Sequence, residues 1–63
     1  MSLSKSLAAA RKRAGLSQAQ LAKKIGRSAG TVAGWETDRN SARMANLVKV
    51  AKVLKTTVAE LLA

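Results

Sequence analysis

Residues 17 to 36, SQAQLAKKIGRSAGTVAGWE, decide the fold of this chain because they predict two short helices joined by a tight glycine turn. Ser17 is suited to cap a first helix over residues 18 to 25, and Gln20, three residues further on, completes a capping box. The apolar residues of that helix fall on one face at helical spacing. They are Leu21, Ala22 and Ile25.

The second helix of this pair is predicted over residues 29 to 36. Gly26 stands where the preceding helix needs a left-handed residue at its C-terminus, and Ser28 can cap the next helix. Val32 and Trp35 form its apolar stripe, and we expect Trp35 in the core. Two helices with so short a connection must cross steeply. The second is then held out as a ridge of a width that the DNA major groove accepts.

The rest of the chain predicts three further helices and no strand. One helix is expected over residues 3 to 14, capped by Ser2 or Ser4, and another over residues 43 to 54 after a surface loop at 37 to 42. Thr57 and Glu60 form a second capping box that opens a last short helix. The expected buried residues of these three helices are Leu3, Leu7, Ala10, Ala14, Met44, Leu47, Val50, Ala51, Leu54, Val58, Leu61 and Leu62. The prediction is one compact all-α domain of five helices over residues 1–63.

Charge and composition limit the possible functions. The 63 residues include 12 Lys and Arg against three acids, a net charge of +9, with neither Cys nor His. This excludes disulfides, the usual zinc sites and imidazole catalysis, and the three carboxylates are too scattered for a catalytic site. We therefore expect no enzyme activity, no metal and no cofactor. No apolar run is long enough to span a bilayer, so we expect a cytoplasmic protein. The excess positive charge indicates a polyanionic partner.

Three segments in order carry a resemblance to the phage repressor and Cro class of helix-turn-helix proteins. They are GLSQAQLAKKIG at 15 to 26, TVAGWE at 31 to 36 and LVKVAKVLKTTVAELL at 47 to 62. The resemblance implies a lambda-repressor-like domain with its helix-turn-helix at helices two and three. The second helix would lie across the DNA backbone and the third in the major groove. It also implies dimers on two-fold symmetric operators, with half-sites about 34 Å apart.

The resemblance assigns roles to individual residues. Gln18 matches a residue that donates to a phosphate, and Ser28 matches the cap of the third helix, which also reaches phosphate. Arg11 and Glu36 match an arginine and an acid that pair between helix one and the end of helix three. We expect a partly buried structural ion pair there, with no direct contact to DNA.

The third helix departs from the family at the positions that face bases. Ala29, Gly30, Ala33 and Gly34, which we place on its outer face, cannot hydrogen-bond through their side chains, and Thr31 is the one polar side chain between Ser28 and Trp35. Three explanations remain open. The glycines let the backbone approach the groove floor, with Ala29 against a thymine methyl. Alternatively DNA shape is read, with Arg39 or Arg43 in a narrow minor groove. In the third explanation, the surface has lost its specificity.

The expected function is that of a DNA-binding transcriptional regulator, a repressor, which acts on double-stranded DNA as a weak homodimer formed on the DNA. Apolar candidates for the dimer contact are Val48, Val53 and Ala63. Alternatives are a protein-interaction module such as an antitoxin, a fold with only nonspecific DNA affinity, and a cationic amphipathic peptide acting at membranes. The residues expected to contact DNA are Gln18, Arg27, Ser28, Ala29, Gly30, Thr31, Gly34, Arg39, Asn40, Ser41 and Arg43.

Overall fold

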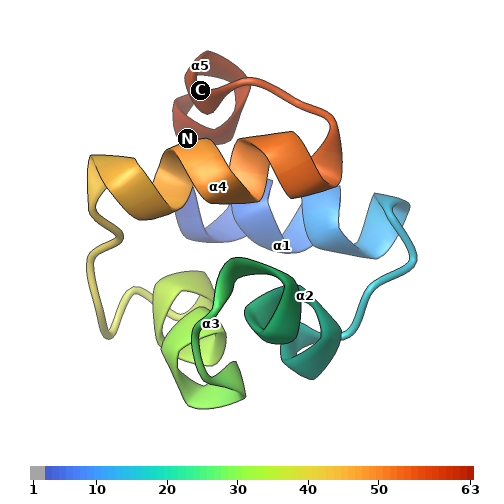
Figure 1. Ribbon diagram of the computed structural model, residues 1–63. Coiled ribbons are helices and arrows are strands. Elements are labelled where there is room, and N and C mark those ends of the chain that lie inside the picture. Colours follow the sequence, from blue (N-terminus) through green and yellow to red (C-terminus); the bar gives the residue numbers. More distant parts are fainter. Residues whose placement is uncertain (1–2) are drawn as a thin grey trace.

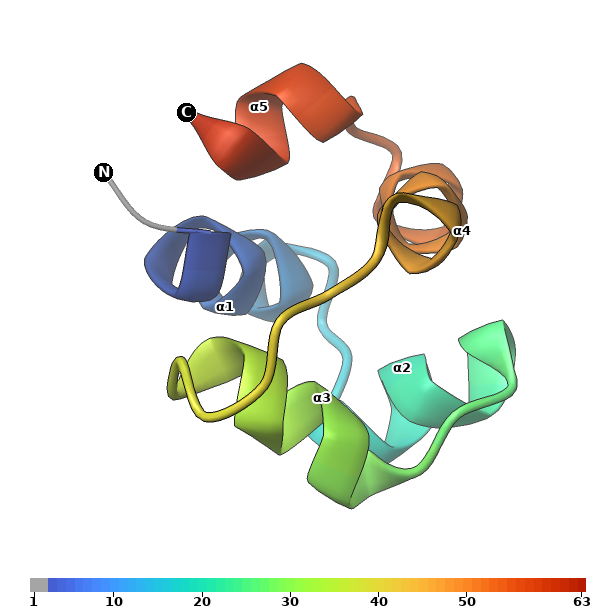
Figure 2. The same cartoon turned by 90° about the vertical axis from the view of Figure 1, so that its left-hand side faces the viewer.

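The computed structural model describes residues 3–63, which form five α-helices joined by short loops (Figure 1). In chain order they are α1 (Leu3–Arg13), α2 (Gln18–Ile25), α3 (Ala29–Glu36), α4 (Met44–Leu54) and α5 (Val58–Leu62). In both Figure 1 and Figure 2, α2 and α3 lie at one end of the molecule and α5 at the other, with α1 and α4 between them. The predicted five-helix, all-α architecture is confirmed.

Local signals in the central segment give the helix boundaries residue for residue. Ser17 accepts a hydrogen bond from the backbone N–H of Gln20, and the Gln20 side chain accepts one from the backbone N–H of Ser17, so the capping box is complete. Gly26 ends α2 with φ of 73°, in the left-handed region. The Ser28 hydroxyl accepts from the backbone N–H of Thr31 and caps α3. Because each of these contacts spans four residues or fewer, sequence spacing was sufficient to predict them.

Three predictions about the other helix ends need correction. Ser4 lies inside α1, buried, where its hydroxyl donates to Asp38 at 3.0 Å, so it is not a cap; Ser2 lies outside the described residues. The helix predicted over residues 43 to 54 begins at Met44, and Arg43 occupies its N-cap position without a side-chain capping bond. At α5 only half of the expected capping box forms. Thr57 accepts from the Glu60 backbone, but the Glu60 carboxylate accepts from the hydroxyl of Thr56.

The core lies where the stripes of all five helices meet. Its fully buried large side chains are Leu7, Leu21, Val32, Val50 and Leu61. Trp35 is 3% exposed, which confirms its placement in the core. It lies one turn along α3 from Val32, so these two side chains hold the inner face of α3 on the core, while α3 packs on both α2 and α1.

Three residues predicted to be buried are exposed. Met44 and Leu62 keep 58% and 49% of their surface, and Ala14 is exposed just beyond the last residue of α1. At about 100° per residue, Met44 lies roughly 70° from the centre of the buried stripe of α4, on its first turn. In α5, which has five residues, Leu61 takes the inward position and its neighbour Leu62 is rotated outward. No helix within residues 3–63 has both the length and the apolar character needed to cross a membrane.

Candidate nucleic-acid interface

An ion pair fixes the C-terminal end of α3 against α1. The Nε atom of Arg11 donates to Glu36 Oε2 at 2.6 Å, and a terminal nitrogen of Arg11 donates to Oε1 at 3.0 Å. The other terminal nitrogen donates to the carbonyl of Leu16 at 2.8 Å. The two side chains are 11% and 6% exposed, so this is a nearly buried, bidentate pair. The predicted pairing of Arg11 with Glu36 is confirmed, and it joins the last residue of α3 to α1.

Gln18 joins the same network. Its Nε2 atom donates to Glu36 Oε1 at 3.0 Å, a contact that the sequence did not predict. A glutamine amide carries two N–H groups, so this bond orients the amide and leaves one N–H for another acceptor. Gln18 therefore links the start of α2 to the end of α3.

The pair shifts the ionisation of both partners. Burial is the largest effect on Glu36 and on its own would raise the pKa. Hydrogen bonds from Arg11 and Gln18 and the charges of Arg11 and Lys12 outweigh it, so the pKa of Glu36 is lowered. The hydrogen bond to Glu36 raises the pKa of Arg11, which keeps its charge throughout the working range.

The lowered pKa of Glu36 predicts acid sensitivity. A carboxyl whose pKa is lower in the folded state contributes stability that is fully present above its unfolded pKa, about 4.3, and that is lost as pH falls toward the folded value. We expect the melting temperature to fall when the pH is lowered below about 4.3. Thermal melts followed by circular dichroism measure this, and Glu36→Gln, which lacks the titrating group, is the control. An equally steep acid loss in that variant would assign the effect to other groups.

The first turn of α3 presents a small, polar surface to solvent. Ser28, Ala29 and Gly30 are exposed and Thr31 is half-buried. The hydroxyl oxygens of Ser28 and Thr31 are 2.9 Å apart and share a hydrogen bond. A Cβ added to Gly30 would come no closer than 3.9 Å to the Ser28 hydroxyl. The side chains at this end are therefore short enough for another molecule to approach the backbone closely.

Gly34 does not lie on this outer face, and the expectation that it does is wrong. It is buried beneath Asn40, and its carbonyl accepts the backbone N–H groups of Arg39 at 2.9 Å and Asn40 at 3.1 Å. A Cβ at Gly34 would overlap the Asn40 amide and lie 2.9 Å from its Cγ. The glycine thus serves to seat the loop at residues 37–43 on α3, because only a residue without a side chain lets Asn40 pack there. Ala33, expected on the same face, is half-buried.

The seated loop forms one wall of a cleft beside α3. The cleft has a volume of about 450 Å³ and brings together five of the predicted contact residues: Arg27, Thr31, Asn40, Ser41 and Arg43. Thr31 and Trp35 line it from α3, and Asn46 lines it from the first turn of α4. Sequence reasoning missed Asn46, although a polar amide three residues after Arg43 was a signal for it. No carboxylate lines the cleft, so its two arginines give it a positive charge. Arg39 is exposed on the loop but is not part of the lining.

The two α3 glycines predict opposite responses to alanine. Gly30→Ala is expected to raise the free energy of unfolding by up to about 1 kcal/mol, since alanine is the better helix former and the site is open. Gly34→Ala forces the Asn40 side chain off α3, so we expect it to be less stable than Gly30→Ala by at least about 1 kcal/mol. Urea unfolding measures both changes.

A second substitution provides the control for this comparison. Asn40→Ala removes the overlapping amide, so Gly34→Ala combined with Asn40→Ala is expected to recover part of the helix gain. Equal stabilisation by Gly30→Ala and Gly34→Ala alone would show that Asn40 does not need the space above Gly34.

Comparisons with known proteins come from sequence and from structure. The sequence model of a family described as helix-turn-helix matches residues 7–61. The P22 c2 repressor, in complex with synthetic operator 9T, superimposes with a TM-score of 0.92 at 27% identity, covering 98% of this chain and 94% of that one. Hydroxypropylphosphonic acid epoxidase from S. wedmorenis superimposes with a TM-score of 0.87 at 27% identity, covering 97% of this chain but 32% of that one. A comparison with curated protein sequences finds no match.

Proposed function

The chain belongs to the helix-turn-helix family of the Cro/C1 type, and from that membership we propose that it is a DNA-binding transcriptional regulator, acting as a repressor. In this proposal α3 enters the major groove of an operator half-site and α2 lies across the backbone. Repression follows from occupancy, because a bound domain excludes polymerase from the site. The likeness to the epoxidase extends over about a third of that enzyme and supports a shared helical fold.

One observation carries the proposal beyond the family. The exposed first turn of α3 lies beside a cleft whose lining holds Arg27 and Arg43 and no carboxylate. A groove-bound helix needs cations on its flanks, because phosphate contacts position the protein before bases are read. The arrangement of neutral, small residues on α3 with arginines beside it fits that division of work.

We assign the contact residues to two roles. Gln18, Ser28, Arg27, Asn40 and Ser41 contact phosphates. At the start of α2 the donor to phosphate is the remaining N–H of the Gln18 amide. At the start of α3 the donors are the exposed groups of its N-terminus. Arg39 and Arg43 contact either phosphate or a narrow minor groove.

Base readout then falls to the first turn of α3. Ala29 supplies an apolar contact for a thymine methyl, and the Thr31 hydroxyl, which is hydrogen-bonded to Ser28, supplies a polar group for base edges. Gly30 allows close approach of the backbone. Gly34 has no direct role in this scheme, since its position serves the loop that carries Asn40 and Ser41.

The proposed assembly is a weak homodimer formed on the operator, in which each subunit contributes a single domain over residues 1–63. The proposed location is the cytoplasm, in association with the nucleoid. Val48 and Ala63, two of the three expected dimer contacts, are exposed, whereas Val53 is half-buried against the core. Met44 and Leu62 add exposed apolar surface on α4 and α5. Two subunits one duplex turn apart, about 34 Å, would match a two-fold symmetric site.

Selection of bound sequences from a random DNA pool, at two salt concentrations, tests the proposal. We expect an enriched palindrome at both concentrations. Enrichment of A/T-rich DNA without a palindrome would favour readout of shape, and no enrichment would favour nonspecific affinity alone. Gly30→Ala separates close backbone approach from the other two explanations, because only close approach predicts that the added methyl group abolishes selection.

A further inference from the structure

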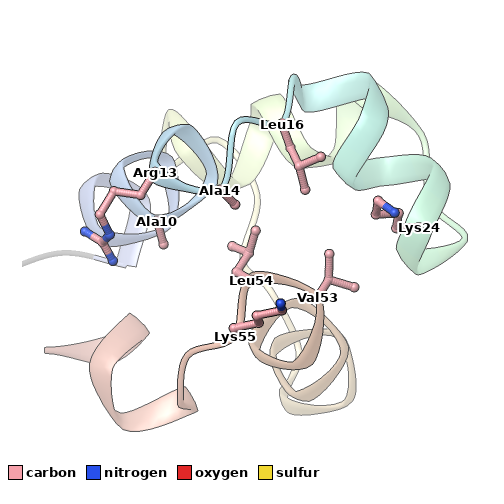
Figure 3. A pocket seen from close by; sticks show the side chains of 8 residues that line it. All are labelled: Ala10, Arg13, Ala14, Leu16, Lys24, Val53, Leu54 and Lys55. Atoms are coloured by element: carbon pink, nitrogen blue, oxygen red, sulfur yellow. The ribbon is translucent and has the colours of Figure 1, made fainter.

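A second concave surface lies apart from the face formed by α3. The C-terminal ends of α1, α2 and α4 enclose a groove of about 440 Å³ (Figure 3). None of its lining residues belongs to α3 or to the loop at 37–43, so a molecule in this groove does not occupy the first turn of α3. The groove therefore needs its own explanation.

The floor of the groove is apolar. Ala10 and Leu54 are buried there, Leu16 and Val53 are half-buried, and Ala14 is exposed. Figure 3 shows the side chains of Leu16, Val53 and Leu54 gathered between the α1–α2 connection and α4. Leu16 and Val53 pack on the core but keep part of their surface accessible. An apolar side chain that covered this floor would be favourably removed from water.

The rim of the groove is positively charged. Arg13, Lys24 and Lys55 are exposed and come from the last turn of α1, the last turn of α2 and the end of α4. No carboxylate lines the groove. Cations at helix C-termini are favoured by the helix dipole, which explains each one locally. That explanation does not account for three of them around the same apolar floor.

Lys55 is held in an unusual backbone conformation. It ends α4 with φ of 55°, in the left-handed region, where the C-termini of α1 and α2 have Gly15 and Gly26, each at 73°. Glycine adopts this conformation without strain and lysine does not. At the left-handed position that ends α4 the chain therefore has a lysine, at a conformational cost, where α1 and α2 have glycine. Strained residues of this kind gather at functional sites.

From these observations we propose that the groove binds an acidic peptide segment of a partner protein, with an apolar side chain on the floor and carboxylates against Arg13, Lys24 and Lys55. Nucleic acid fits this groove poorly, because a phosphate backbone offers nothing apolar to cover Leu16 and Val53. The volume lies within the range of small-ligand sites and accommodates an anchoring side chain with its neighbours. Because α3 is left uncovered, the partner can bind while the domain is on DNA.

Titration of the isotope-labelled chain with short acetylated peptides tests this proposal. The probe has the sequence Asp-Glu-Leu-Leu-Glu-Asp, and the matched peptide has two glycines in place of the leucines. With the leucine peptide we expect amide shifts at residues 13 to 16, at Lys24 and at residues 53 to 55, and at least fivefold weaker binding of the glycine peptide. Equal binding of both peptides, shifts centred on α3, or no shifts would overturn the proposal.

Three variants locate the interaction. Lys24→Glu combined with Lys55→Glu is expected to weaken the leucine peptide at least tenfold. Lys49→Glu combined with Lys52→Glu, at two exposed positions on α4 outside the groove, is the matched charge control and is expected to have less than a twofold effect. Val53→Thr keeps the shape and adds a hydroxyl to the floor, so it is expected to weaken the leucine peptide and leave the glycine peptide unchanged. Equal losses in the charge-control variant would mean that net charge alone attracts the peptide, and the groove would be excluded. Melting temperatures of all variants verify that they are folded.

Discussion

Replacing Glu36 by glutamine is expected to lower the free energy of unfolding by about 3 kcal/mol, the largest effect that we predict for a single substitution. The substitution leaves the nearly buried guanidinium of Arg11 without its counter-charge, and Gln18 loses a charged acceptor. A domain of this size has a total stability of only about 3 to 9 kcal/mol, so at least about a third of that stability would be lost. Thermal unfolding measures the change, with a fall in melting temperature of more than about 10 °C expected.

Two controls separate the pair from general loss of charge. Glu60→Gln removes a carboxylate that is exposed, and its effect is expected to stay within about 0.5 kcal/mol. In an Arg11→Met background, Glu36→Gln is expected to cost much less, because no buried charge is then left unpaired. If the cost of Glu36→Gln were the same in both backgrounds, the ion pair would not be what holds α3.

The affinity of one subunit for an operator half-site is expected to fall roughly a hundredfold between about 50 and 200 mM salt, if that subunit neutralises about four phosphates. The reason is the release of counterions from DNA when arginines and lysines reach the backbone. Arg43→Ala is expected to reduce the slope of log affinity against log salt by about one, with no structural cost, since Arg43 makes no side-chain capping bond to α4. Fluorescence anisotropy with a labelled duplex measures the slope.

The control for the salt experiment removes one positive charge from another part of the surface. Lys49 is exposed on α4 outside the cleft, so Lys49→Ala is expected to leave the slope unchanged. A flat response of the wild-type chain to salt would exclude docking through phosphates. Equal changes in slope for the Arg43 and Lys49 variants would show that DNA contacts are not confined to the side of α3.

The contacts within the helix-turn-helix segment were predicted from the sequence more completely than the contacts between this segment and the rest of the chain. The caps at Ser17 and Ser28 and the left-handed Gly26 could be predicted because each depends on residues within a few positions of it. The pair between Arg11 and Glu36, 25 residues apart, was predicted only through the resemblance to a family. Gln18, the third residue of this hydrogen-bond network, was assigned to phosphate. Its bond to Glu36 depends on how α2 and α3 lie relative to each other in space.

The candidate interface was predicted in part. Arg27, Asn40, Ser41 and Arg43 were named as flanking residues, and the structure brings them around one cleft. Gly34 was misplaced because helical spacing alone does not tell which neighbour covers a position. Here the covering group is Asn40, which the backbone returns to α3 through two hydrogen bonds to the Gly34 carbonyl.

By itself, the sequence determined the number, type and central boundaries of the helices, the absence of thiol and imidazole chemistry, and the positive charge that a polyanion would attract. Capping, periodicity and composition are short-range or global properties, and folding does not alter them. Only the tertiary structure decided which face of α3 is free, that Gly34 seats a loop, and that three helix ends meet at an apolar groove. Those features depend on contacts between residues far apart in the chain, and the packing of the helices on one another sets them.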